Sequence, residues 1–257
     1  MSQKDNCINK LDSNSTSNIL PYASVQYWDL RYLKNSYSYD WLEDYLSLKD
    51  DLFNIFTNVS NTMKIDIKYI NILNIGCGTS PLFDNINKDF GIDCVTNIDY
   101  SMTDINIMQS RYNNHINMKW IKDDIFNIKL SPNSFDVIFD KATSDTFYCQ
   151  IDSTNKLLLY YKIVFLALKV GGSFILISRK DNRKHLIDIC GFNFDVVVTQ
   201  KDHQINDTQS TSNYIYICTK TNDSFDEVAF NKLYNNGVVD NLNDDNDDSN
   251  LIDNSLN

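Results

Sequence analysis

Between about residues 69 and 218, short apolar runs alternate with segments whose apolar residues repeat at helical spacing. Such runs predict strands, because a strand that is covered on both faces reads as a nearly continuous hydrophobic stretch. Strands alternating with helices favour an α/β fold with a mainly parallel sheet and helices on both of its faces. The expected strands cover residues 69–75, 94–98, 118–121, 135–139, 173–178, 192–198 and 214–218.

The last two strands follow one another without a clear helix between them, which indicates an antiparallel hairpin at one edge of the sheet. Helices are expected where the periodicity changes. Ser80 and Pro81 predict a helix start with Ser80 as the N-cap. Residues 157–168 predict a helix that ends at Gly171-Gly172, and residues 42–56 predict an amphipathic helix ahead of the first strand.

The chain of 257 residues fits one domain with tails. Residues 1–20 are rich in Asn, Ser, Asp and Lys and predict a disordered lead-in. Residues 21–220 are expected to form the domain, including a helical cap at its N-terminal end. From residue 221 the chain becomes acidic and rich in Asn and Asp, so residues 221–257 predict a disordered tail, with acidic docking as an open alternative.

The formal net charge of −11 disfavours nucleic-acid binding, which normally requires a basic surface, and it suits a basic protein partner. The six cysteines include no Cys-x-x-Cys pair and only three histidines occur, which argues against a metal site. The sequence contains no apolar leader and no long apolar run, so we expect neither export nor a membrane span. These features together predict a reduced protein of the cytosol or the nucleus, with the cytoplasm as the expected location.

The glycines that follow the first expected strand indicate a ligand site. Gly76-Cys77-Gly78 stands between a strand and a helix, where the backbone can approach a ligand and the helix start offers free N–H groups. A dinucleotide-binding loop would have a third glycine three residues after Gly78, and this chain has Pro81 there. The loop therefore departs from the NAD and FAD pattern.

Asp99 ends the second expected strand about 20 residues after the glycines, an offset at which a carboxylate can accept hydrogen bonds from both hydroxyls of a ribose. Tyr100, next in the chain, can flank an adenine ring. An aspartate that ends a strand is also a common helix cap, so the second reading stays open.

Two further acidic groups follow strands. Asp123 and Asp124 end the third strand, where one can accept from an adenine amino group and the other can cap a turn, unless both are simply solvated. The strand at residues 135–139 delivers Asp140 and Lys141 to the carboxyl edge of the sheet, where open α/β sheets bind ligands.

An aromatic segment, residues 27–42, precedes the first strand and is longer than the sheet needs. It contains Tyr27-Trp28-Asp29-Leu30-Arg31-Tyr32 and Tyr39-Asp40-Trp41-Leu42. Two interpretations apply: a helical cap over one face of the sheet, or a lid that packs aromatic rings on a bound ligand.

In combination, these motifs resemble those of the class I methyltransferases. The resemblance runs from Tyr27 to Ser178. Among these enzymes, the chain resembles the methyltransferase-like group that modifies lysines of translation elongation factor 1-alpha, to which the mitochondrial citrate synthase lysine methyltransferase is related. It rests on separated motifs that occur in order, at residues 27–32, 39–41, 72–80, 97–101 and 134–141.

The resemblance implies a Rossmann-like, mostly parallel seven-stranded sheet with an antiparallel edge strand. It also implies S-adenosylmethionine as cofactor, and methyl transfer to a protein lysine such as one of elongation factor 1-alpha. No catalytic base is named, because Asp140, Asp145 and a tyrosine are equal candidates. The cofactor-binding residues that it implies are Trp28, Tyr32, Tyr39, Gly76, Asp99, Tyr100, Asp123, Asp124 and Lys141.

Two departures from the family pattern concern the substrate and one site residue. The family has Asp-Lys-Gly-Thr-Leu-Asp after the fourth strand, whereas this chain has Ala142 and Ser144 in place of the glycine and the leucine. These changes bear on the substrate channel. Asp123 also stands where the family often has an apolar residue, which weakens its assignment.

Three other functions remain open. A methyltransferase that acts on a small molecule would use the same fold. A non-catalytic cofactor-binding protein is motivated by Ala142 and Ser144. A nucleic-acid methyltransferase is disfavoured by the charge and by the absence of an Asn/Asp-Pro-Pro-Tyr-like motif after Phe139.

Overall fold

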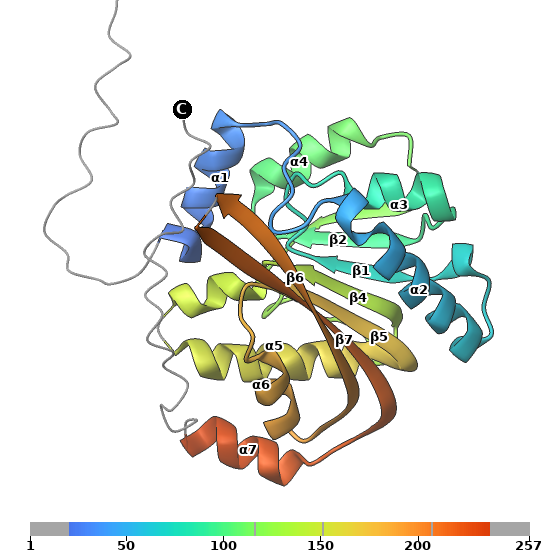
Figure 1. The fold of residues 1–257 in the computed structure, drawn as a ribbon, viewed down its shortest axis with the longest axis vertical. Coiled ribbons are helices and arrows are strands. Elements are labelled where there is room, and N and C mark those ends of the chain that lie inside the picture. Colours follow the sequence, from blue (N-terminus) through green and yellow to red (C-terminus); the bar gives the residue numbers. More distant parts are fainter. Residues whose placement is uncertain (1–20, 116, 151, 207, 237–257) are drawn as a thin grey trace, which may run out of the picture.

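A seven-stranded sheet with helices on both faces forms the centre of the computed structural model, which describes residues 21–115, 117–150, 152–206 and 208–236 (Figure 1). The strands lie in the order β3-β2-β1-β4-β5-β7-β6. The first five are parallel, and β7 is antiparallel to both β5 and β6. The strands are β1 (Ile72–Ile75), β2 (Val95–Asp99), β3 (Met118–Lys122), β4 (Phe135–Lys141), β5 (Leu168–Ser178), β6 (Phe192–Asn206) and β7 (Gln209–Phe225).

The parallel sheet and its antiparallel edge confirm the predicted fold class. Among the described residues, seven α-helices and three short 3₁₀ helices surround this sheet. They are α1 (Val25–Lys34), α2 (Tyr45–Met63), α3 (Leu82–Phe90), α4 (Met102–Arg111), α5 (Ser153–Ala167), α6 (Arg183–Ile189) and α7 (Glu227–Asn236), with the 3₁₀ helices η1 (Pro21–Ala23), η2 (Ile67–Tyr69) and η3 (Ser144–Cys149).

Successive residues of the central strands enter two different cores, because side chains alternate across a strand. Leu73 and Ile138 pack with α5 and α6 on one face, and Ile72 and Val137 pack with α2 and α3 on the other. All four residues of β1 are buried. This double burial explains why the strand sequences are nearly continuous apolar runs.

The strand order reverses between β1 and β4, since β2 and β3 lie to one side of β1 and β4 and β5 lie to the other. In open α/β sheets, ligands bind outside the carboxyl ends of the strands at such a reversal. The topology therefore predicts a ligand site among the loops after β1, β2 and β4.

Several helix boundaries differ from those expected. Helix α2 begins at Tyr45 rather than at residue 42, because Asp44 caps it by accepting the amide of Ser47 at 2.9 Å. Helix α3 begins at Leu82, with Pro81 as its cap, and Ser80 Oγ accepts the Leu82 amide at 3.2 Å. Ser80 is thus one residue further from the helix than expected.

Helix α5 ends at Ala167, four residues before the glycines that were expected to end it, and β5 begins at once. Gly172 lies within β5, where a Cβ atom would come within 2.6 Å of the carbonyl oxygen of Asp136. Glycine is needed there for the close approach of β4, not for ending the helix.

The folded chain also extends beyond residue 220, where the sequence placed the end of the domain. β7 continues to Phe225, and α7 brings Phe230, which is 2% exposed, against the rings of Phe192 and Phe225. These apolar contacts outweigh the acidic composition around them. The rest of the predicted tail, residues 237–257, and the predicted lead-in, residues 1–20, lie outside the described residues.

Among the helices that the structure describes, none combines the length and the apolar character needed to cross a membrane.

Candidate functional site

A cavity of about 910 Å³ opens at the carboxyl edge of the sheet, where the strand order reverses. Loops after β1, β2, β3 and β4 line it, together with the aromatic segment. The structure brings all nine cofactor-site residues expected from the sequence to this one cavity. They are Trp28, Tyr32, Tyr39, Gly76, Asp99, Tyr100, Asp123, Asp124 and Lys141.

The glycine loop after β1 is held tightly in place. Gly76 has a φ of +62°, and its amide donates to the carbonyl of Ile98 at 2.8 Å. A Cβ atom on Gly76 would lie 2.1 Å from Oγ1 of Thr143, so the packing of the loop after β4 is what requires glycine here. Gly78 has a φ of +50° and donates its amide to Asp99.

Asp99 ends β2 and is 6% exposed. Its Oδ1 accepts the amide of Ser101 at 2.9 Å, and its Oδ2 accepts the amide of Gly78 at 3.2 Å. Burial raises the pKa of this carboxyl to about 6, although the two backbone donors lower it. At neutral pH the group is therefore mainly an acceptor that faces the cavity, with Tyr100 half-buried beside it.

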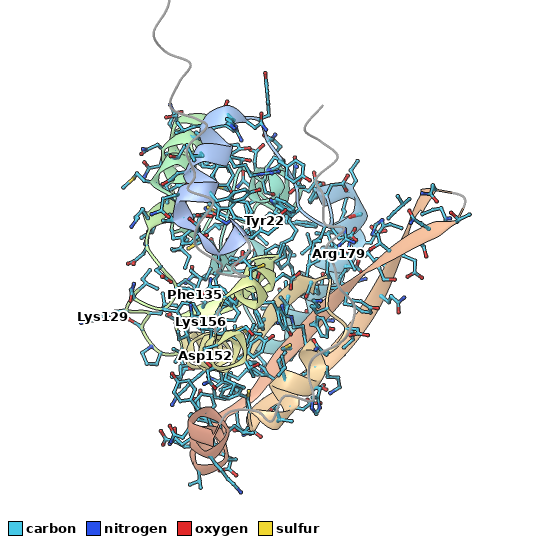
Figure 2. The ribbon with its side chains drawn as sticks, turned by 90° about the vertical axis from the view of Figure 1, so that its left-hand side faces the viewer. Tyr22, Lys129, Phe135, Asp152, Lys156 and Arg179 are labelled. Carbon is cyan, nitrogen blue, oxygen red and sulfur yellow. The ribbon has the colours of Figure 1, made fainter. Side chains whose placement is uncertain are left out.

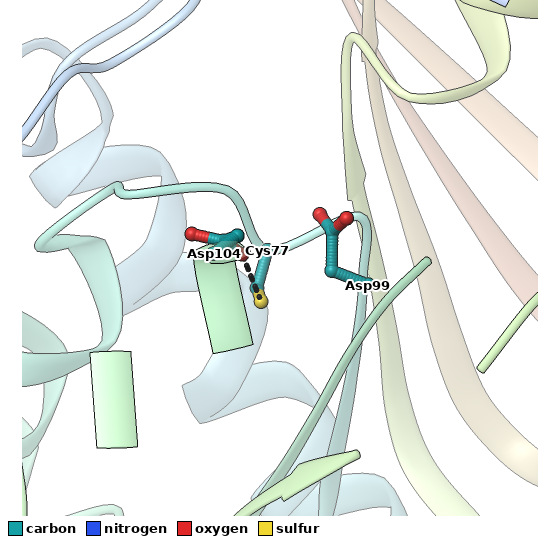
Figure 3. A group of neighbouring side chains, drawn as sticks. All are labelled: Cys77, Asp99 and Asp104. Carbon is teal, nitrogen blue, oxygen red and sulfur yellow. Dashed lines mark hydrogen bonds between the residues drawn. The ribbon is translucent and has the colours of Figure 1, made fainter. Parts of the chain in front are cut away.

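Beside Asp99 lies a second buried acid, Asp104, which no sequence motif indicated (Figure 3). Asp104 is 0% exposed, and its Oδ2 accepts from the thiol of Cys77 at 3.4 Å. Its Oδ1 has no hydrogen-bond partner among the described residues. The Sγ atom of Cys77 and one carboxylate oxygen each of Asp99 and Asp104 all lie within 4.8 Å of one another.

Burial, and secondly the neighbouring Asp99, raise the pKa of Asp104 to about 8. Two carboxylates this close cannot both ionise cheaply, so the pair retains one proton near neutral pH. Asp104 follows Ser101 by three residues, and Ser101 Oγ accepts its amide at 3.2 Å as an ordinary N-cap. From the sequence this acid therefore looks like part of an exposed helix cap.

The two acids after β3 have different roles in the loop. Asp124 Oδ1 accepts the amide of Phe126 at 3.0 Å and caps the turn, which matches one of the expected alternatives. Asp123 Oδ1 accepts the amide of Asp124 at 2.8 Å. Both carboxylates are half-buried and line the cavity, so neither is simply solvated.

The aromatic segment forms one wall of the cavity. Trp28 stacks on Tyr32 with ring centroids 5.9 Å apart, and Trp41 meets Trp28 edge-on at 5.8 Å. Asp29 fixes α1 to the start of α4 by accepting the hydroxyl of Ser101 at 2.6 Å. The cap over the sheet face is provided by α2, while the residues before it face the cavity.

Lys141 holds this wall in place. Its Nζ donates to Asp40 Oδ1 at 2.7 Å and to the carbonyl of Trp41 at 3.0 Å, and its side chain is 7% exposed. Ser80 Oγ donates to the same carboxylate oxygen of Asp40. Burial lowers the pKa of Lys141, and Asp40 opposes that shift. The motif Tyr39-Asp40-Trp41 predicted no role for Asp40.

Of the acids considered as a proton acceptor, Asp140 is enclosed on every side. It is 0% exposed, and it accepts the hydroxyl of Tyr160 at 2.7 Å and the amide of Thr143 at 2.8 Å. Asp145 lines the cavity, but its Oδ1 pairs with Nη2 of Arg183 at 2.5 Å. Both carboxylates brace loops, and no base is assigned.

The long hairpin of β6 and β7 completes the rim, a feature that the short expected strands did not indicate. Ile205, near its tip, lines the cavity. Asn213 donates to the carbonyl of Leu42 at 3.1 Å and to Glu43 Oε1 at 2.8 Å. The same oxygen of Glu43 lies 2.6 Å from Nε2 of His203. The hairpin therefore holds the end of the aromatic segment.

Burial would raise the pKa of Glu43, but hydrogen bonds from Ser47, Asn213 and His203 outweigh it, and the pKa is lowered. Glu43 is thus an ionised, buried acceptor that joins the hairpin to the start of α2.

Ala142, at the position where the family pattern has glycine, has a φ of +67°. A left-handed conformation costs an alanine about 1 kcal/mol relative to glycine. We expect Ala142→Gly to raise the free energy of unfolding by about 0.5 kcal/mol, since the more flexible unfolded chain offsets part of the gain. Urea denaturation checks this. Ala229→Gly, within α7, is the matched control and should lower stability by roughly 1 kcal/mol. Equal losses in both variants would contradict the explanation.

Ser144, which stands where the family has leucine, is 0% exposed, and its Oγ has no hydrogen-bond partner within the described part of the chain. Its amide donates to Asp140. The backbone of this loop is therefore anchored in spite of the smaller side chain.

Comparison with known proteins agrees with this geometry. Residues 72–158, which contain the glycine loop, Asp99, the two acids after β3 and Lys141, match the family described as methyltransferase domain. This stretch of the chain is similar to a methyltransferase domain. The match begins with β1 and ends within α5, so it covers β1 to β4 and excludes the aromatic segment, β5 and the hairpin.

Two curated relatives match about half of the chain. EEF1A lysine methyltransferase 4 from Bos taurus is 31% identical over 127 residues, covering 48% of this chain and 45% of the relative. The protein of the same name from Mus musculus is 32% identical over 126 residues, with 48% and 45% coverage. The chain thus matches less than half the length of these relatives.

Solved structures support the fold of the methyltransferase domain. The N-methyltransferase NodS from Bradyrhizobium japonicum, in complex with S-adenosyl-L-homocysteine, superposes with a TM-score of 0.53 at 16% identity, covering 77% of this chain and 98% of that one. A protein that converts a disulfide bond into a thioacetal group in echinomycin biosynthesis gives a TM-score of 0.55 at 14% identity, with 83% and 98% coverage. The domain match and this fold together imply S-adenosylmethionine as the cofactor.

Proposed function

We propose that this protein transfers the methyl group of S-adenosylmethionine to the side-chain amine of a lysine in another protein. The observation that carries the proposal is the cavity itself, which joins the glycine loop, the buried acceptor Asp99 and an aromatic wall within a methyltransferase domain. The lysine assignment is supported by the curated relatives, whose name describes lysine methylation of elongation factor 1-alpha.

In this proposal Asp99 accepts the two ribose hydroxyls, since it is a buried carboxylate at the end of β2. Tyr100 flanks the adenine ring, and Asp123 and Asp124 border it. The remaining expected residues, Trp28, Tyr32, Tyr39, Gly76 and Lys141, shape the part of the cavity that receives the amino-acid end and the methyl group.

The cofactor supplies an electrophilic methyl group on a sulfonium, so the protein has mainly to position a neutral amine in line with it. A free lysine has a pKa of about 10.4 and must lose its proton before it can attack. Aromatic rings surround Trp41 on this wall, and desolvation of the amine against them would favour its neutral form. Asp140 and Asp145 hold the neighbouring loops in position through their hydrogen bonds.

A basic protein is the proposed partner, because a net charge of −11 attracts a cationic surface. Elongation factor 1-alpha is the first candidate. A reduced, cytoplasmic setting belongs to the same proposal, and it is supported by the five described cysteines, all of which are free thiols.

The test incubates the purified protein with methyl-labelled S-adenosylmethionine and two acceptors, a whole-protein extract and purified elongation factor 1-alpha. We expect a labelled protein band that disappears when the lysines of the extract are first blocked by reductive methylation. Label found only in small metabolites would favour the small-molecule alternative. Cofactor binding without transfer to any acceptor would favour the non-catalytic one.

A further inference from the structure

Arg179 follows β5 directly and lines the cavity together with Tyr22 and Lys156. All three residues are labelled in Figure 2. Its Nη1 donates to the hydroxyl of Thr211, and its Nε is buried without a hydrogen-bond partner among the described residues. No described carboxylate lies within ion-pair distance of its guanidinium. An arginine is always charged, so such a group in a cavity requires an explanation.

The carboxylate attached to this loop is already in use. Asp145 Oδ2 accepts the backbone amide of Arg179 at 2.9 Å, and Asp145 Oδ1 pairs with Arg183 at 2.5 Å. Burial of Arg183 at 0% exposure makes that pair hard to exchange. Asp145 therefore fixes the position of Arg179 without neutralising its charge.

A second cation lines the same cavity with a neutral partner. Lys156, on α5, donates to the side-chain amide oxygen of Gln150. Arg179 is set apart from the proposed ribose site, because β5 lies three strands from β2 in the sheet. At about 4.8 Å per strand this places Arg179 roughly 14 Å from Asp99 along the sheet edge.

We propose that Arg179 binds a carboxylate of the molecules that fill the cavity, with Lys156 adding to the positive potential. A guanidinium pairs with a carboxylate through two parallel hydrogen bonds, and Arg179 has an unused Nε for such a pair. Two carboxylates are available under the proposed function on which this inference rests. One belongs to the amino-acid end of the cofactor, and the other is an acidic side chain next to the target lysine.

The first experiment distinguishes these sources by calorimetry. The parent, Arg179→Met and Arg179→Lys are titrated with S-adenosylhomocysteine and with methylthioadenosine, which lacks the amino-acid carboxylate. If Arg179 holds the cofactor carboxylate, Arg179→Met lowers the affinity for S-adenosylhomocysteine about 10-fold or more and leaves methylthioadenosine unchanged. Lys184→Met, which removes an exposed cation paired with Asp188 on α6, is the control and should change neither affinity.

The second experiment uses lysine peptides in matched pairs that differ only by Glu or Gln beside the lysine, with methyl-labelled cofactor. If the carboxylate belongs to the acceptor, the parent prefers the Glu peptides by about 10-fold in KM. Arg179→Met loses this preference because its KM for the Glu peptides rises to that for the Gln peptides, while its affinity for S-adenosylhomocysteine in the first experiment stays that of the parent. Arg179→Lys retains part of the preference.

Arg179 is not a carboxylate-binding residue if Arg179→Met, folded as judged by its thermal transition, matches the parent in both experiments. A parent that binds neither nucleoside, or that labels no lysine peptide while binding the cofactor, identifies a failure of the proposed function instead. In that case the assignment of Arg179 is withdrawn together with it.

Discussion

Asp99→Ala is expected to weaken the binding of S-adenosylmethionine by about 2–4 kcal/mol, or roughly 30- to 1000-fold. The alanine removes the carboxylate that is proposed to accept both ribose hydroxyls, and each such charge-assisted hydrogen bond contributes about 1.5–3 kcal/mol before compensation. The same carboxylate fixes Gly78 and Ser101, so part of the loss will come from the loop. Calorimetric titration gives the affinity directly.

Asp99→Asn separates these contributions, because asparagine keeps the size of the side chain and one acceptor oxygen. Asp93→Ala, which removes an acid whose described side-chain partner is Asn117, is the matched control. Binding by the parent should also weaken as the pH falls below about 6, where Asp99 takes up a proton and stops accepting from both hydroxyls. Unchanged affinity in Asp99→Ala would remove Asp99 from the cofactor site.

Asp104→Asn is expected to stabilise the protein at alkaline pH by an amount on the order of 3–5 kcal/mol. In the unfolded chain an aspartate has a pKa of about 3.9, whereas burial raises the pKa of Asp104 to about 8 in the folded protein. Between these values the folded state binds a proton that the unfolded state has released. The stability linked to Asp104 is therefore complete below pH 4 and is lost as the pH rises to 8.

Urea denaturation at pH 5, 7 and 8.5 measures this difference. The asparagine does not titrate, so the gap between variant and parent should widen with increasing pH and be smallest at pH 5. Asp140, whose pKa is also raised, is common to both proteins and cancels in the comparison. Asp99 titrates together with Asp104, so the trend reports the loss of the proton that the two acids share. Asp50→Asn, on the exposed side of α2, is the matched control. A constant gap at all three pH values would mean that Asp104 is not the titrating group.

The parts of the fold that were predictable are those encoded by neighbouring residues. Apolar runs placed β1 to β4 to within a few residues, because a strand buried on both faces leaves a local signal. The cavity was predictable for a related reason. Parallel strands end at the same edge, so Gly76, Asp99 and Lys141 had to meet once the sheet was correct.

The features that were missed depend on contacts between distant segments. Lys141 could be placed at the cavity, but its partner Asp40 lies 101 residues away. Asp104 was not predicted, since its burial beside Cys77 and Asp99 is invisible in the local sequence. Arg179 gave no signal at all, because an unpaired arginine is recognised only after every possible acid around it has been assigned.

The clasp between Glu43 and Asn213 spans 170 residues of chain, and it has a consequence for biosynthesis. The aromatic wall that carries Asp40 and Trp41 is held at its end only after β7 has paired with β5 and Asn213 has bonded to the carbonyl of Leu42. A nascent chain that has exposed all the residues of the methyltransferase match, up to residue 158, still lacks this clasp. Full cofactor affinity should therefore arise late in translation, after the hairpin has left the ribosome.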